Sequence, residues 1–153
     1  MTVNLVHKGG KSMFEKIDRI AIAVKDLEKA AAFFSDLLDI DFDIVGTQPE
    51  LGMRGGYSAC GLELIEPTHP KSLIARFLEQ RGEGLWAVVL KVKNMDEMIK
   101  KFEAKGLKVA GDVTVGSMRE VAFHPKGSYG VEIVLAEYPE KHGATVAALS
   151  QED

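Results

Sequence analysis

Two stretches of the chain, residues 18–30 and 86–98, share one pattern of hydrophobic and polar positions. Each begins with alternating apolar positions, passes through a basic residue and an Asp or Asn, and ends in an amphipathic segment. Alternation with a period of two predicts a strand, and apolar residues three to four apart predict a helix. Solenoid repeats have periods of about 20 to 50 residues, which are shorter than this separation. The pattern therefore predicts one domain made of two similar halves.

Each half is predicted to contain a strand, a helix and three further strands. In the first half, a strand lies within 14–24, Asp26 caps a helix over 27–38, and strands follow near 40–45, 53–60 and 62–66. A turn-rich loop covers 46–52, and a connecting helix covers 71–81. In the second half, Asn94 caps a helix over 95–104 and Gly106 ends it. Strands near 107–110, 117–124 and 131–137 complete it.

The leading strand of each half has one face of large apolar residues and one face of small ones. The large residues are expected to lie under the helices: Ile20, Ile22 and Val24, then Val88, Leu90 and Val92, with Trp86 on the same side. The opposite face carries Arg19, Ala21 and Ala23, then Ala87, Val89 and Lys91. Small residues beside one charge are unusual for a core and typical of a cavity wall.

Composition narrows the class of protein. The 153 residues are 46% hydrophobic and 27% charged with a net charge of -4, as expected for a globular domain without a nucleic-acid partner. No apolar run is long enough to span a membrane, and residues 1–13 lack the apolar core of a signal peptide. Cys60 is the single cysteine, which favours a reducing compartment. These features predict a cytoplasmic protein that does not bind membranes.

The paired halves resemble the vicinal oxygen chelate superfamily, which includes glyoxalase I, bleomycin-resistance proteins, extradiol dioxygenases and methylmalonyl-CoA epimerase. The epimerase family is the most similar, through five stretches in conserved order: 17–24, 49–54, 62–68, 74–85, and 124–126 before Gly130. The resemblance implies an α+β fold in which two βαβββ modules form a curved sheet that encloses a cleft. It implies a domain over 15–139, with module one at 15–66, the connecting helix at 71–81 and module two at 85–137. Residues 1–14 would be an arm and 140–153 a tail.

Epimerases of this family hold a divalent metal ion with two His, one Gln or Glu, and one Glu. The corresponding positions here are Arg19, Glu63, Ala87 and Val134, so that three of the four ligands are replaced. Arginine keeps its proton in proteins and would repel a cation. The resemblance therefore implies a protein without a metal ion or another cofactor.

Polar residues remain at this position. Glu132 shares a strand face with Val134, and we expect Arg19, Glu63 and Glu132 to converge where the metal would have been. In one interpretation, Arg19 forms a structural ion pair. In the other, Arg19 receives a substrate carboxylate or enolate oxygen and Glu63 or Glu132 is the catalytic base. The residues expected to contact the substrate are Arg19, Glu50, Ala87, Val89 and Val134.

Two functions remain open from the sequence. The first is an epimerase-like, metal-independent isomerase or lyase that acts on a small carboxylic acid or acyl thioester. The second is a non-catalytic protein that binds or sequesters a small molecule. A homodimer is expected by analogy with the family and because the half-sheets expose edges.

Overall fold

The same order of strands and helices occurs twice in the computed structural model, which describes residues 9–49 and 51–139. The first half contains β1 (Phe14–Ala23), α1 (Leu27–Leu38), β2 (Asp43–Gln48), β3 (Met53–Tyr57) and β4 (Leu62–Pro67). The second half contains β5 (Gly84–Val92), α3 (Met95–Glu103), β6 (Val109–Val115), β7 (Met118–Phe123) and β8 (Glu132–Glu137). The helix α2 (Leu73–Arg81) connects them.

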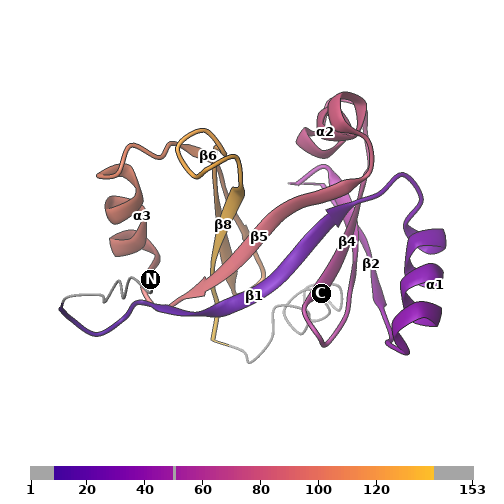
Figure 1. The fold of residues 1–153 in the computed structure, drawn as a ribbon, viewed down its shortest axis with the longest axis horizontal. Coiled ribbons are helices and arrows are strands. Elements are labelled where there is room, and N and C mark those ends of the chain that lie inside the picture. Colours follow the sequence, from indigo (N-terminus) through magenta and orange to yellow (C-terminus); the bar gives the residue numbers. More distant parts are fainter. Residues whose placement is uncertain (1–8, 50, 140–153) are drawn as a thin grey trace, which may run out of the picture.

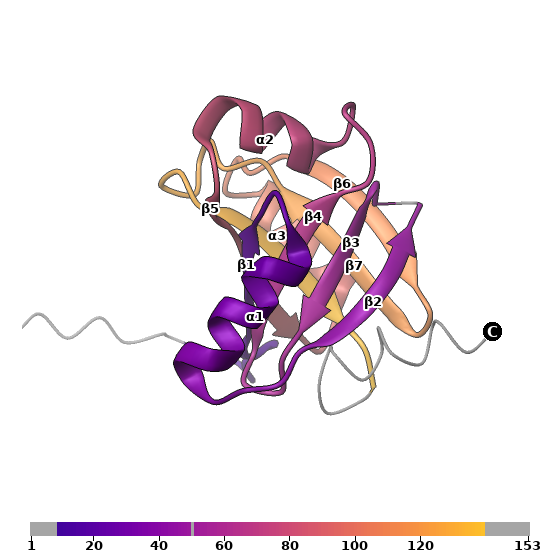
Figure 2. The same ribbon diagram turned by 90° about the vertical axis from the view of Figure 1, so that its right-hand side faces the viewer.

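All eight strands form one sheet in the order β2-β3-β4-β1-β5-β8-β7-β6. β1 runs parallel to β4, β5 runs parallel to β8, and the antiparallel pair of β1 and β5 joins the two halves. The sheet curls so that β2 and β6 lie on the same side of the molecule, away from β1 and β5 (Figures 1 and 2). The predicted fold, two βαβββ modules in one curved sheet, is confirmed. The module and domain boundaries remain predictions.

Side-chain caps fix the two equivalent helices. Asp26 accepts a hydrogen bond from the backbone N–H of Lys29, and Asn94 accepts one from that of Glu97, as the sequence predicted. Gly106 has φ of 85°, and its N–H donates to Glu103 O at 2.8 Å. This left-handed conformation after a helix favours glycine. None of the described helices is both long and apolar enough to cross a membrane.

β3 ends at Tyr57, before its predicted end near 60, and two other strands are displaced along the chain from their predicted ranges. β2 was expected near 40–45 but spans Asp43–Gln48, and β6 was expected near 107–110 but spans Val109–Val115. Both are outer strands of the sheet, paired on one side only. The exposed polar positions of such strands weaken the apolar signal, and pairing with the neighbouring strand decides where they begin and end.

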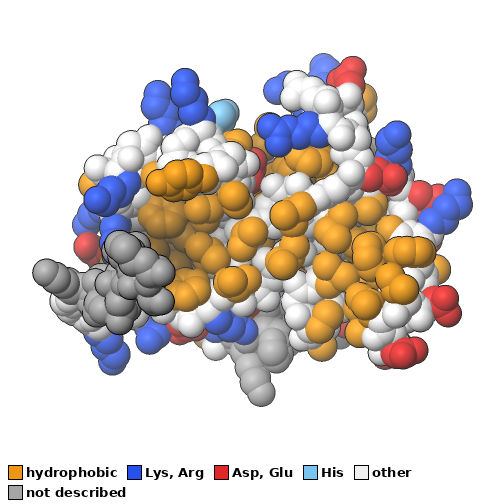
Figure 3. Space-filling model, in the orientation of Figure 1, with side chains coloured by type: hydrophobic (Ala, Val, Ile, Leu, Met, Phe, Trp, Pro, Cys, Tyr) orange, Lys and Arg blue, Asp and Glu red, His pale blue; other side chains and the backbone are white. Residues whose placement is uncertain are grey.

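The helices cover less of the convex face than the sequence predicted. Val24 and Val92 are buried, beside α1 and α3 respectively. Ile17 and Ile20, in the middle of β1, are 62% and 42% exposed. The two helices flank β1 and β5 from opposite ends, so that neither reaches the middle (Figure 1). An apolar strip therefore remains uncovered on this face (Figure 3).

Three β-bulges or irregularities interrupt the pairing of β1 with β5, and two of them involve Asp18 and Trp86. Asp18 is an extra residue between the pairs Ile17–Leu90 and Arg19–Val89. Trp86 is the extra residue between Ala87, which pairs with Ala21, and Leu85, which pairs with Ile22. Asp18 and Trp86 occupy equivalent positions in the two halves. A bulge breaks the alternation of faces, and it therefore turns both side chains toward the concave side.

Candidate functional site

The concave side of the sheet holds a cavity of about 340 Å³ between the two modules. Its wall combines β1, β3 and β4 from the first module with β5 to β8 from the second, and the loop before α2 contributes its exposed edge. The lining residues are Arg19, Pro49, Leu51, Gly52, Met53, Glu63, His69, Lys71, Ser72, Leu73, Ile74, Trp86, Val89, Gly111, Val113, Glu120, Ala122 and Val134.

Arg19 is part of this wall and is only 5% exposed. Its Nε donates to Glu63 Oε2 at 2.8 Å, and its Nη1 donates to Asp18 Oδ2 at 2.7 Å. Its Nη2 donates to Glu120 Oε1. Each of the three nitrogens of the guanidinium therefore contacts a different carboxylate. Such charge-assisted hydrogen bonds in a buried position fix the side chain in one geometry.

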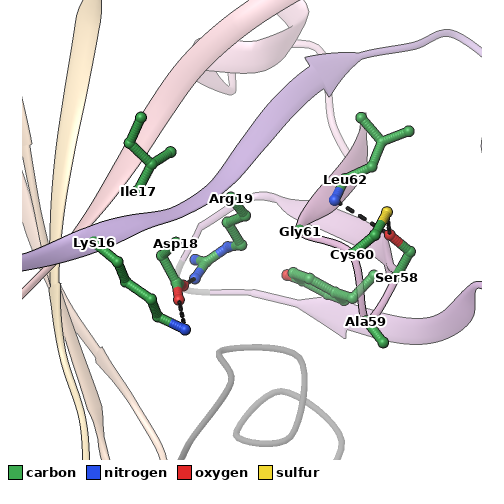
Figure 4. A pocket seen from close by; sticks show the side chains of 10 residues that line it. Lys16, Ile17, Asp18, Arg19, Ser58, Ala59, Cys60, Gly61 and Leu62 are labelled. Atoms are coloured by element: carbon green, nitrogen blue, oxygen red, sulfur yellow. Dashed lines mark hydrogen bonds and ion pairs between the residues drawn. The ribbon is translucent and has the colours of Figure 1, made fainter.

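Further polar groups hold the carboxylates in turn. Asp18 accepts from the hydroxyl of Tyr138, and Lys16 Nζ lies 3.5 Å from Asp18 Oδ1. Tyr57 forms a hydrogen bond with Glu63, and its ring centre lies 6.0 Å from the guanidinium carbon of Arg19. Figure 4 shows Arg19, Asp18 and Lys16 beside a smaller cavity of about 170 Å³. Arg19 lines both this cavity and the 340 Å³ cavity.

The electrostatics of this cluster follow from burial and charge. Burial alone would lower the pKa of Arg19, but Glu120, Glu63 and Asp18 raise it well above its ordinary value, so the cation is permanent. Burial raises the pKa of Glu63, although Arg19 opposes the change. Burial also raises the pKa of Tyr57, which keeps its hydroxyl protonated.

The structure brings together some of the residues predicted to form the site. The predicted contact between Arg19 and Glu63 is present, and Val89 and Val134 line the same cavity. Ala87 is buried and lines a neighbouring cavity of about 410 Å³. Glu50 lies outside the described residues, and its predicted substrate contact remains a prediction.

Glu132 does not converge with Arg19 and Glu63 as the sequence predicted. Its side chain lines the neighbouring cavity with Trp86 and Ala87, where burial raises its pKa. The register of the strands gives the reason. Val134 pairs with Val89, next to Arg19, whereas Glu132 pairs with Ala87, two residues farther along β5 from Val89. Glu132 is level with Glu63, but β1 and β5 lie between their strands. Glu132 therefore shares a strand face with Val134 but does not line the same cavity.

Glu120 on β7 takes the place predicted for Glu132. Met118, Glu120 and Ala122 face the concave side, while Val121 and Phe123 belong to the core under α3. This alternation was readable in the sequence and could have placed Glu120 on the cleft side. Trp86 was predicted on the helix side, but the bulge places it in the walls of the 340 Å³ cavity and the 410 Å³ cavity.

The donor set does not fit a divalent metal ion. Among residues 9–49 and 51–139, no three His, Cys, Asp or Glu side chains are arranged to hold one. The guanidinium of Arg19 lies between Asp18, Glu63 and Glu120, and its permanent charge would repel a cation. Val134, at another expected ligand position, has no donor atom.

Comparisons with known proteins identify relatives. Residues 18–123 match the family model of the Glyoxalase/Bleomycin resistance protein/Dioxygenase superfamily. The mitochondrial methylmalonyl-CoA epimerase of Homo sapiens is 29% identical over 129 residues, covering 80% of this chain and 73% of that protein.

Solved structures give the same relationship. The methylmalonyl-CoA epimerase of Mycobacterium tuberculosis superposes with a TM-score of 0.77 at 26% identity, covering 88% of this chain and 95% of that chain. A variant of the Streptomyces coelicolor methylmalonyl-CoA epimerase in complex with 2-nitronate-propionyl-CoA has a TM-score of 0.75 at 25% identity, covering 83% and 99% of the two chains.

Proposed function

The chain belongs to the glyoxalase/bleomycin resistance/dioxygenase superfamily, and we propose that it is an epimerase-like member that binds a small acyl thioester or carboxylic acid without a metal ion. The observation that carries the proposal is the guanidinium of Arg19, fixed by three carboxylates in the wall of a 340 Å³ cavity. The named relatives support the choice of ligand, because they are methylmalonyl-CoA epimerases and one contains an acyl-CoA analogue.

Arg19 is proposed to orient the ligand. A guanidinium has five N–H donors, and Glu63, Asp18 and Glu120 take three of them. A remaining Nη2 donor can hold the carbonyl oxygen of a thioester and stabilise the negative charge that develops there on enolisation. In the catalytic form of the proposal, Glu63 would then be the base of an isomerase or lyase.

A non-catalytic function is the second candidate. Glu63 accepts from Arg19 and forms a hydrogen bond with Tyr57, and both contacts stabilise its charge and weaken it as a base. A carboxylate held in this way suits a protein that binds its ligand without converting it. Exchange of the ligand's α-hydrogen separates the two candidates, as described below.

Filling the cavity is expected to abolish ligand binding without unfolding the protein. Gly111 lines the cavity, and a Cβ atom added there would meet no atom within 4 Å. Gly111→Leu should therefore occupy the space of the ligand while the fold is retained. The measurement is calorimetric titration with propionyl-CoA, and Thr114→Leu, at an exposed position of the same strand, is the matched control.

Propionyl-CoA should bind to the wild type and to Thr114→Leu, but not to Gly111→Leu. No binding to the wild type, or equal binding to both variants, would contradict the proposal. In D₂O, loss of the α-proton signal of bound propionyl-CoA in the NMR spectrum would identify the isomerase chemistry. An unchanged signal would identify the binding function.

A homodimer is part of the proposal and rests on the convex face. Figure 3 shows hydrophobic side chains on this face over β1 and α1. Ile17 of β1 is 62% exposed, and Phe33 of α1 is 61% exposed. Contiguous apolar surface of this kind is commonly covered by a partner.

Light scattering at micromolar protein should give the mass of a dimer, and Ile17→Lys should shift it to that of a monomer. Val109→Lys, at an apolar residue of β6 that is 40% exposed, should remain dimeric. A monomeric wild type would refute this prediction.

The proposal also places the protein in the cytoplasm without a nucleic-acid partner. The single cysteine, Cys60, and the net charge of -4 support this placement.

A further inference from the structure

Where Arg19 lines the cavity, the acidic groups outnumber the basic groups. Three carboxylates, those of Asp18, Glu63 and Glu120, contact the single guanidinium of Arg19. Lys16 approaches Asp18 at 3.5 Å from the opposite side, where the smaller cavity lies (Figure 4). With all these groups ionised, the cluster carries one excess negative charge. If Glu63 binds a proton, the cluster becomes neutral, and even then no cation is left uncompensated.

The other basic side chains that line the cavity among the described residues lie at its edge. His69 and Lys71 are exposed and belong to the loop before α2. A ligand that enters with its anionic end outermost can reach them. The wall near Arg19 is otherwise apolar, through Val89, Ala122 and Val134.

We propose, on the basis of the function proposed above, that the cavity selects thioesters whose acyl group is uncharged and rejects those whose acyl group ends in a carboxylate. A carboxylate placed beside Glu63 and Glu120 would lose its hydration and gain no free cation in return. It would also be repelled by the excess negative charge across a short, poorly screened distance. A neutral acyl group meets neither penalty, and its carbonyl oxygen can still accept a hydrogen bond from Arg19.

The carboxylates around Arg19 favour one of the two roles considered for this residue. Its side chain was expected to receive either a substrate carboxylate or an enolate oxygen. The three carboxylates around it oppose the first role, because they already neutralise its charge. The second role is compatible with them, because a neutral carbonyl oxygen enters the site before any charge develops.

The test compares two ligands that differ by one carboxylate. Propionyl-CoA and methylmalonyl-CoA share the whole coenzyme portion and the thioester, and only methylmalonyl-CoA has an acidic acyl group. Calorimetric titration of the wild type at neutral pH should give a Kd for propionyl-CoA that is lower than the Kd for methylmalonyl-CoA by about tenfold or more. The ratio of the two Kd values measures the selectivity. Glu120→Gln removes one of the negative charges and should reduce this ratio. Glu103→Gln, at an exposed position of α3, makes the same change in charge away from the cavity and should leave the ratio unchanged.

The outcomes separate this inference from the proposed function. Equal or tighter binding of methylmalonyl-CoA by the wild type would overturn the inference and leave the proposed function standing. Failure of both thioesters to bind would overturn the proposed function and the inference with it. If Glu120→Gln does not fold, as judged by circular dichroism, the ratio measured on the wild type decides. A ratio that falls equally in Glu103→Gln would contradict the assignment of selectivity to the cavity.

Discussion

Replacing Arg19 by alanine is expected to lower the free energy of unfolding by about 3 to 5 kcal/mol. The substitution removes the guanidinium but leaves Glu63 and Asp18, with side chains 5% and 2% exposed, and the nearly buried Glu120 facing one another. Asp18 keeps its contact with Lys16, whereas Glu63 and Glu120 lose the cation that they share, and buried carboxylates in that situation repel each other. The loss should therefore greatly exceed the effect of deleting a surface ion pair.

Urea denaturation at neutral pH measures this effect, and Arg54→Ala supplies the matched control. Arg54 also binds two carboxylates, those of Glu28 and Glu66, but its side chain is 29% exposed. Exposed ion pairs contribute about 0 to 1 kcal/mol, so the control should lose little stability. If Arg19→Ala loses less free energy of unfolding than Arg54→Ala, Arg19 does not stabilise the protein by neutralising buried carboxylates.

The loss caused by Arg19→Ala should shrink as the pH falls. Burial already raises the pKa of Glu63 in the wild type, and removal of Arg19 removes the main opposing influence. A carboxyl group whose folded-state pKa exceeds its unfolded value destabilises the protein above that pKa. The destabilisation disappears as the pH falls through the folded-state value toward the unfolded one. Urea denaturation repeated at decreasing pH should therefore bring the variant closer to the wild type.

Placing the family's metal ligands at Arg19, Ala87 and Val134 is expected to create a metal site in place of the Arg19 cluster. Arg19→His and Val134→Glu would add an imidazole and a carboxylate to the cavity that Glu63 lines, and Ala87→His would add a second imidazole level with Glu63 across β1. The change also removes the guanidinium that repels a cation. Two His and two carboxylates are an adequate ligand set for zinc, so the triple variant should bind about one zinc ion per chain.

Elemental analysis of protein purified without chelator measures this directly. The wild type should contain far less than one zinc, cobalt, nickel or manganese ion per chain. The double variant Arg19→His with Ala87→His lacks the fourth ligand and should bind zinc more weakly than the triple variant. Near-stoichiometric metal in the wild type would refute the proposal that Arg19 replaces the ion.

The sequence by itself determined the local structure and the side of the sheet on which Arg19 lies. Asp26 and Asn94 cap their helices through contacts with residues three positions later, so the sequence of each short segment is enough to predict them. The alternation of Arg19 with Ile20 assigns them to opposite faces, and the structure agrees. The repeated pattern gave the two modules, because each module is formed mainly by neighbouring segments of the chain.

Tertiary structure alone decided which carboxylates meet Arg19. The register of β8 against β5 moves Glu132 into another cavity, and the curvature of the sheet brings Glu120 of β7 to Nη2 of Arg19. The bulges at Asp18 and Trp86 turn both residues to the concave side against the expected alternation. Register and bulges arise from pairing between distant strands, where the packing of many side chains selects one alignment. Such non-local energies leave no mark on the spacing of residues along the chain, and the site could therefore be read only in part.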